Sequence, residues 1–123
     1  MAKIAFDIDD TLYKIIKVDR VLADNLTMKD GGFKQVPDYD LISVLRWFYN
    51  NGDEVFVWSA GGIDYARQWV EKFGLSEMVT VMRKMNTDKE GKGTGMPIMD
   101  IAFDDCETKL AKVDIRVKRE PWQ

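Results

Sequence analysis

Short apolar runs that end abruptly at polar residues alternate along this chain with longer amphipathic stretches. The runs at residues 2–6, 54–58, 78–83 and 99–103 are too short for helices, so each is predicted to be a buried strand. Residues 113–117 alternate apolar and polar side chains, which is typical of an edge strand. The apolar pattern therefore predicts about five strands.

Two other stretches carry the helical period. After Pro37, which suits the first turn of a helix, apolar residues recur at three- and four-residue spacings until residues 50–52 end the pattern. A second helix is predicted over residues 64–73, with Gly74 as its C-terminal cap. Residues 108–112 are expected to form a further short helix.

Strands that alternate with helices predict an α/β fold with a mostly parallel sheet, in a single domain that spans residues 1–123. The stretch before the first helix has no clean period. In it, residues 13–18 suit one arm of a hairpin, residues 20–25 a short helical turn and residues 30–32 a tight turn. Residues 84–97 are polar and are predicted to be a loop.

Composition excludes several classes of function. With 123 residues, of which 46% are hydrophobic, the chain can bury a core as one domain. A net charge of −3 with mixed signs argues against binding nucleic acid through bulk charge. No apolar run approaches the ~20 residues of a membrane span, and the first strand leaves no room for a signal peptide.

Cysteine and histidine usage narrows the chemistry further. The single cysteine, Cys106, excludes an internal disulfide and fits a reducing compartment, so a cytoplasmic protein is expected. The absence of histidine excludes histidine-based triads and His-ligated zinc, so acid and base chemistry near neutral pH must use carboxylates or lysines.

Carboxylates gather where two of the predicted strands end. Asp7 and Asp9 follow the first strand, and because a strand alternates its faces, their side chains are expected to point the same way. Asp104 and Asp105 end the run at residues 99–103 in the same manner. Paired carboxylates repel each other unless a cation lies between them, and oxygen ligands favour Mg²⁺. Taken alone, either pair is also compatible with an acidic turn.

Three strand ends in this order resemble the motifs of the haloacid dehalogenase-like (HAD) superfamily of phosphotransferases. Its first motif, Asp-x-Asp-x-Thr, is similar to Asp7, Asp9 and Thr11. Its second, a strand that ends in Ser or Thr, is similar to Ser59, and its fourth, a strand that ends in two aspartates, to residues 104–105.

This resemblance covers residues 2–118 and implies a three-layer Rossmann-like fold. The first strand would lie at the centre of the sheet, between those at residues 54–58 and 99–103. Residues 12–36 would form a flap beside the active site, because neither place where the family inserts a cap domain has room for one.

The resemblance also implies roles for individual residues. Asp7 would be the nucleophile that forms an aspartyl-phosphate, and Asp9 the general acid and base. Ser59 would hydrogen-bond a phosphoryl oxygen, helped by backbone N–H groups near Ala60 and Gly61. The implied Mg²⁺ ligands form one acidic set: Asp7, Asp9 through its backbone carbonyl, Asp104 and Asp105.

The family's catalytic lysine has three candidates. Lys84 ends the third strand, as in the deoxynucleotidase branch of the family, and is preferred; Lys92 and Lys89 follow in the loop. Asp10 stands where the family often has glycine. Cys106 has carboxylates beside it, which disfavours its thiolate, so a structural role is expected.

The expected function is that of a Mg²⁺-dependent phosphatase, which hydrolyses a phosphomonoester of an unidentified small molecule or nucleic-acid end. Residues 58–62 look similar to small HAD hydrolases, some of them from phages, and an open site resembles the phosphatase half of polynucleotide kinase-phosphatases. The flap, the substrate or a second subunit must close such a site, so a homodimer is one expected arrangement. The flap's apolar residues favour such packing: Tyr13, Ile15, Ile16, Val18, Val21 and Leu22.

Two alternatives compete with an enzyme. A receiver domain of two-component signalling has this length, but its phospho-accepting aspartate would end the third strand, where this chain has Ser59 or Lys84. A non-catalytic HAD-like domain that binds a phosphorylated ligand is the other alternative.

Overall fold

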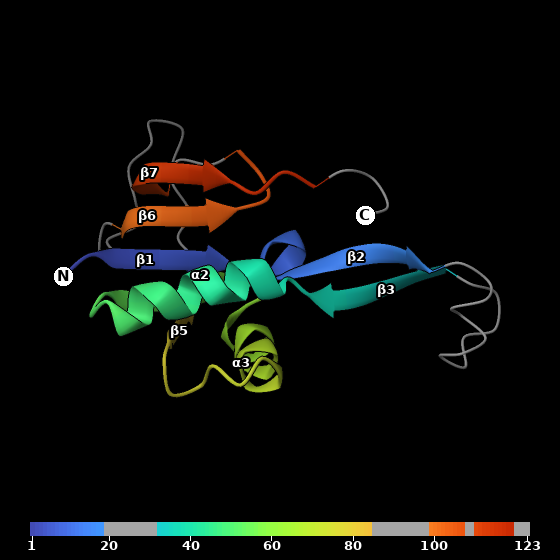
Figure 1. Ribbon diagram of the computed structural model, residues 1–123, viewed down its shortest axis with the longest axis horizontal. Coiled ribbons are helices and arrows are strands. Elements are labelled where there is room, and N and C mark those ends of the chain that lie inside the picture. The colour runs from blue at the N-terminus through green and yellow to red at the C-terminus, as the bar shows by residue number, and fades with distance from the viewer. Residues whose placement is uncertain (19–31, 85–98, 108–109, 120–123) are drawn as a thin grey trace.

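The computed structural model describes residues 1–18, 32–84, 99–107 and 110–119, and a parallel sheet forms its core (Figure 1). Five strands lie in the order β5-β4-β1-β6-β7, and every neighbouring pair is parallel. The prediction of an α/β fold with about five, mostly parallel strands is confirmed. The strands are β1 (Lys3–Asp7), β4 (Glu54–Ser59), β5 (Thr80–Arg83), β6 (Met99–Asp104) and β7 (Ala111–Arg116).

The strand β1 lies at the centre of the sheet, as expected. It pairs with β4 on one side and β6 on the other, so that Ile4 lies opposite both Val55 and Ile101. From β1 the sheet grows through β4 to β5, and the chain then returns to β6 on the other side of β1. In open α/β sheets, ligands bind at such a reversal of strand order, outside the carboxyl ends of the strands.

The start of the outer strand β7 differs from the prediction. Residues 108–112 were expected to be helical, but Ala111 and Lys112 already belong to β7, and residues 108–109 lie outside the described part of the chain. Pairing of Ala111 with Met99 explains the difference, because the ladder to β6 stabilises an extended backbone that local sequence does not specify. The predicted edge strand therefore starts two residues early.

Two helices, α2 (Tyr39–Asn50) and α3 (Ile63–Lys72), cover one face of the sheet. Their buried residues share one apolar cluster with Ile4, Phe6 and Val57. Right-handed crossovers from β1 to β4 and from β4 to β5 add strands in one direction, which puts both helices on the same side. In the described ranges, no helix has the length and apolarity that crossing a membrane requires.

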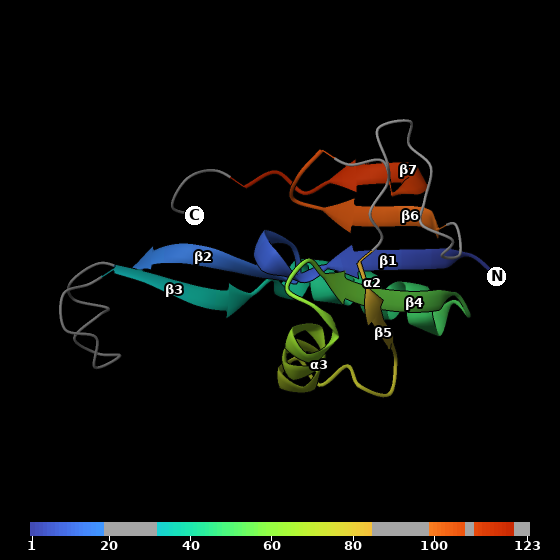
Figure 2. The same cartoon turned by 180° about the vertical axis from the view of Figure 1, so that it is seen from behind.

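The opposite face carries a smaller apolar cluster, which consists of Ala5, Trp58, Met99, Ala102 and Leu110. Figure 2 shows this side, with β1 and β4 in front of α2. Among the described residues no helix packs here, so the expected third layer is not seen in that part of the chain. The short connection from β6 to β7 leaves no length for a crossover helix.

A hairpin extends beyond the carboxyl end of β1 (Figure 1). Its arms are β2 (Tyr13–Val18), which was predicted, and β3 (Gly32–Pro37), which was not. A tight helical turn, η1 (Ile8–Leu12), connects β1 to the hairpin. The predicted helical turn at residues 20–25 and the turn residues 30–31 lie outside the described residues.

The start of α2 also differs from the prediction. Pro37 is the last residue of β3, opposite Tyr13, rather than part of the first helical turn. Asp38 is the N-cap instead: its side chain accepts a hydrogen bond from Leu41 N at 3.0 Å. Its own backbone N–H donates to Leu12 O at 2.8 Å, which joins the helix to the end of η1.

The end of α3 agrees with the prediction. The helix stops at Lys72, Phe73 is the C-cap and Gly74 follows with a φ of 69°. This left-handed conformation is unfavourable for residues with a Cβ, which explains the glycine.

Candidate active site

Three of the predicted site residues are the last residues of neighbouring strands. Asp7 ends β1, Ser59 ends β4 and Asp104 ends β6, and because these strands are parallel neighbours, their carboxyl ends meet at one edge of the sheet. All three side chains are buried, although each is polar. A buried polar group is unfavourable unless it is paired, so this edge requires compensating partners.

Lys84 supplies the main compensation. It follows the last residue of β5, and its Nζ lies 2.7 Å from Asp104 Oδ2 and 3.2 Å from Asp7 Oδ1. Lys84 therefore reaches across from the outer strand to both carboxylates. The other two lysine candidates, Lys89 and Lys92, lie outside the described residues.

The ionisation of Asp7 reflects these opposing effects. Burial raises the pKa of Asp7 from 3.8 to about 7, and the charge of Asp104 adds to this rise, while the Lys84 ammonium lowers it. Burial alone would lower the pKa of Lys84, but Asp104 and Asp7 raise it overall, so the lysine stays cationic. The site thus holds one fixed positive charge between two carboxylates.

The turn after β1 orients Asp7. Thr11 is fully buried, and its Oγ1 donates a long hydrogen bond of 3.4 Å to Asp7 Oδ2. Asp10 has a φ of 56°, the left-handed conformation in which glycine is the least strained residue and Asp and Asn are tolerated. A glycine at position 10 would adopt this conformation with less strain.

Arg119 braces the same turn from the other end of the chain. Its Nε donates to Asp10 O at 2.9 Å and its Nη2 to Thr11 O at 2.8 Å. Nη2 also lies 2.7 Å from Asp38 Oδ2 at the start of α2. One guanidinium therefore ties η1 to the N-cap of α2.

The second acidic motif forms a compact group of possible ligands. In the described part of the chain, one carboxylate oxygen each of Asp104 and Asp105 and the sulfur of Cys106 lie within 4.8 Å of one another. Asp104 Oδ1 accepts the Cys106 N–H at 2.9 Å, whereas the buried Oδ2 has the Lys84 ion pair but no well-aligned hydrogen bond. That oxygen already contacts one cation, the Lys84 ammonium.

Neighbouring charges tune the rest of this group. Burial, followed by the interaction with Asp104, raises the pKa of Asp105. Asp105 and burial raise the pKa of the exposed Cys106 thiol, so its thiolate is disfavoured. The expected disfavoured thiolate agrees with this environment, whereas the exposure of Cys106 gives no support to the expected structural role.

Asp9 faces a different set of partners. Its Oδ1 accepts hydrogen bonds from Tyr13 Oη at 2.6 Å and from Tyr65 Oη at 2.5 Å. Tyr13 is the first residue of β2, and Tyr65 lies in the first turn of α3. From the sequence, Tyr13 was predicted only to be an apolar flap residue, and no role was predicted for Tyr65.

The turn after Ser59 differs in part from the prediction that its backbone N–H groups bind a phosphoryl oxygen. Ser59 Oγ accepts the Gly61 N–H at 3.0 Å, and Ser59 O accepts the Gly62 N–H at 3.1 Å. The Gly61 N–H, which was expected to face an anion, is therefore already bonded within the turn. The Ser59 hydroxyl keeps its own hydrogen to donate.

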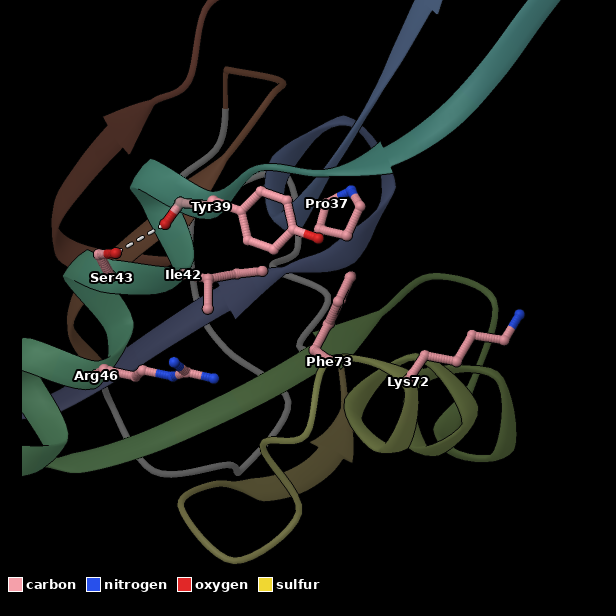
Figure 3. Close-up of a pocket in the computed structure, with 7 residues that line it drawn as sticks. All are labelled: Pro37, Tyr39, Ile42, Ser43, Arg46, Lys72 and Phe73. Carbon is pink, nitrogen blue, oxygen red and sulfur yellow. Dashed lines mark hydrogen bonds between the residues drawn. The ribbon is translucent and has the colours of Figure 1, made fainter. Parts of the chain in front are cut away.

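A separate cavity of about 160 Å³ lies between α2 and α3 (Figure 3). Ile42, Phe73 and Pro37 contribute apolar surface to it, and Arg46 and Lys72 also line it, although the Lys72 side chain points away from the other lining residues (Figure 3). None of the predicted site residues lines this cavity. The carboxylates and the cavity are thus distinct features.

Comparison of the chain with models of protein families, with curated proteins and with solved structures gives no match. The function is therefore argued from the residues at the carboxyl edge of the sheet.

Proposed function

We propose that the protein is a Mg²⁺-dependent phosphatase of the HAD type, which hydrolyses a phosphomonoester through an aspartyl-phosphate on Asp7. One observation carries this proposal: the ammonium of Lys84, which directly follows β5, lies 3.2 Å from Asp7 at the end of β1 and 2.7 Å from Asp104 at the end of β6. Phosphoryl transfer needs a nucleophile surrounded by positive charge, because both the nucleophile and the phosphoryl group are anionic.

The donor set fits Mg²⁺. The ligands would be the carboxylates of Asp7 and Asp104 and the backbone carbonyl of Asp9, with Asp105 beside them. Oxygen donors suit this hard cation, and the buried Asp104 Oδ2 has no well-aligned hydrogen bond. When bound, Mg²⁺ offsets the negative charge that the phosphoryl group brings next to Asp7.

The proposed reaction uses two carboxylates in turn. An Asp7 oxygen attacks phosphorus, the bond from phosphorus to the ester oxygen breaks, and Asp9 gives that oxygen a proton. Water then attacks the phosphorus of the aspartyl-phosphate and gives a proton to Asp9. Inorganic phosphate leaves, and the Asp7 carboxylate is restored. Ser59 would donate its hydroxyl hydrogen to a phosphoryl oxygen.

The substrate is proposed only as a class, a phosphomonoester of a small molecule or of a nucleic-acid end. An open site would be closed by the hairpin, by the substrate or by a second subunit. In the described ranges the hairpin β2–β3 extends beyond the carboxyl end of β1 (Figure 1).

One observation favours the alternative of a non-catalytic phosphate-binding domain. Asp9 Oδ1 is occupied by two phenol groups, and Gly61 N–H is bonded to Ser59. A carboxylate with these partners could stabilise the fold without taking part in catalysis. Hydrolysis of a phosphomonoester distinguishes a phosphatase from a non-catalytic phosphate-binding domain.

The test is hydrolysis of 4-nitrophenyl phosphate by chelator-treated protein, with and without added Mg²⁺. The proposed function predicts turnover only with Mg²⁺, and none for Asp7→Asn. Asp64→Asn is the matched control, because the Asp64 side chain is 95% exposed and forms only a surface ion pair with Arg67. Folded, Mg²⁺-supplied wild-type protein without turnover would support the non-catalytic alternative.

A further inference from the structure

We propose that Tyr13 and Tyr65 are positioning residues that hold Asp9 Oδ1, so that proton transfer to and from the leaving oxygen uses Asp9 Oδ2. The proposal rests on the proposed phosphatase function and adds two residues that the sequence motifs do not contain. Its basis is the pair of hydrogen bonds, 2.6 Å and 2.5 Å long, on one carboxylate oxygen.

The two phenols come from different parts of the fold. Tyr13 is four residues from Asp9, whereas Tyr65 is 56 residues away, so Asp9 lies where the hairpin, η1 and α3 meet. Two donors on one oxygen fix the carboxylate more firmly than one, because they restrict both of its side-chain torsions.

Each ring is held by its own neighbours. Tyr13 is 5% exposed, and its ring stacks on Trp69 with a centroid distance of 4.6 Å. The Tyr65 ring lies against Gly61, where an added Cβ would come within 3.0 Å of Tyr65 Cδ1. The glycine after the Ser59 strand end therefore leaves the space that Tyr65 occupies. The hydroxyls are placed by packing that does not depend on Asp9.

Both phenols donate to the same carboxylate oxygen of Asp9. A neutral phenol gives its O–H to Oδ1, which leaves Oδ2 as the oxygen that can carry the transferred proton. Loss of a phenol would let the carboxylate rotate away from the leaving oxygen.

If the two phenols position Asp9, their loss should affect substrates with poor leaving groups most. Protonation of the leaving oxygen matters for alkyl phosphates, whose alkoxides are poor leaving groups, and little for 4-nitrophenyl phosphate, whose phenolate leaves readily. For Tyr65→Phe we expect kcat/KM for β-glycerophosphate to fall by ~10–100-fold, a part of the ~10²–10⁴-fold that a general acid supplies. We expect kcat/KM for 4-nitrophenyl phosphate, which covers only the steps up to formation of the aspartyl-phosphate, to change by less than about threefold.

Tyr13→Phe should behave in the same way, and Asp9→Asn should show the same selectivity with a larger loss. Combining Tyr65→Phe with Asp9→Asn should add little to Asp9→Asn alone, because both changes remove one function. Tyr49→Phe is the matched control: Tyr49 is 41% exposed on α2, and its variant should match the wild type on both substrates.

The outcomes are distinguishable. Equal losses of kcat/KM on both substrates would show that the phenols support only the fold, and unchanged kcat/KM on both would show that they do not position Asp9. Either result overturns the inference but leaves the phosphatase function standing. A wild-type protein that hydrolyses neither substrate overturns both. If the buried Tyr13→Phe fails to fold, the less buried Tyr65→Phe decides the question alone.

Discussion

Lys84 is the residue on which the electrostatics of the site depend most. It is the ion-pair partner of two buried carboxylates, and its own side chain is only 19% exposed. Attraction between buried charges is offset by the loss of hydration, so such a network adds little net stability when complete. Removing Lys84 has a larger effect, because two buried carboxylates then lose the cation that they share.

Lys84→Met should therefore lower the free energy of unfolding by ~3–5 kcal/mol, the usual loss when one partner of a buried pair is removed. Urea denaturation at neutral pH measures it. Lys112→Met is the control: Lys112 is 67% exposed and forms a surface pair with Asp100, so a loss below ~1 kcal/mol is expected. Equal losses in the two variants would mean that Lys84 does not neutralise the carboxylates.

At the scale of elements, the contact between η1 and the start of α2 is stabilised by charge. Burial alone would raise the pKa of Asp38, but the Leu41 N–H and the Arg119 guanidinium lower it overall. A carboxyl whose pKa is lower in the folded state stabilises the fold above its unfolded pKa. This contribution is lost as the pH falls through the folded value.

Asp38→Asn isolates that charge, because asparagine is an equally good N-cap. Hydrogen bonds to charged groups contribute ~1.5–3 kcal/mol, so the variant should be less stable than the wild type by about this amount at pH 7. The difference should shrink below pH ~4, the unperturbed range of aspartate. Urea denaturation from pH 3 to 7 measures both proteins. A difference that is constant across this range would contradict the ion pair with Arg119.

Helices could be predicted where the helical spacing of apolar residues extends over several turns. Strands could be predicted where an apolar run ends abruptly at a polar residue. The strand ends at Asp7, Ser59 and Asp104 follow from apolar runs that stop, and α2 and α3 follow from helical spacing and the cap at Gly74. The errors lie where tertiary pairing overrides local preference. Pro37 is held extended by the hairpin ladder, and Ala111 by its partner strand β6.

At the scale of the whole molecule, the sheet order explains why part of the candidate site was predictable. Parallel neighbours bring their carboxyl ends together, so acidic motifs at the ends of β1 and β6 had to converge. The contacts of Tyr65 with Asp9 and of Arg119 with Asp10 span 56 and 109 residues. They depend on how α3 and the chain after β7 pack, which no local pattern encodes. Tyr13 differs from these two residues, because it lies only four residues after its partner Asp9 in the sequence.

The hairpin β2–β3 is the segment that we propose closes the site or contacts a second copy. Tyr13 is buried at its base and Ile16 is half-buried, while Ile15 is 36% exposed; Val21 and Leu22 lie outside the described residues. The apolar residues beyond the base are therefore not all covered by the sheet, which agrees with a role at a surface.

Replacing Ile15 and Ile16 together by Ser should impair turnover more than stability, because the sheet core lies elsewhere. The free energy of unfolding should change by less than ~1 kcal/mol, as for other substitutions outside the core. Sedimentation would reveal any loss of a dimer. Val113→Ser is the control, since Val113 is 53% exposed on β7, away from the hairpin. Unchanged mass and turnover in the double variant would show that the hairpin neither closes the site nor joins subunits.

The central claim is that Asp7 becomes phosphorylated. Incubation with 4-nitrophenyl phosphate and Mg²⁺, acid quenching and borohydride reduction convert an aspartyl-phosphate into homoserine, which mass spectrometry of peptides locates. The Asp9→Asn variant should accumulate the intermediate, because loss of the general base slows its hydrolysis. We predict homoserine at position 7, only when both Mg²⁺ and the phosphate ester are present. Reduction at Asp9, Asp104 or Asp105 instead, or turnover without any reducible intermediate, would contradict the account.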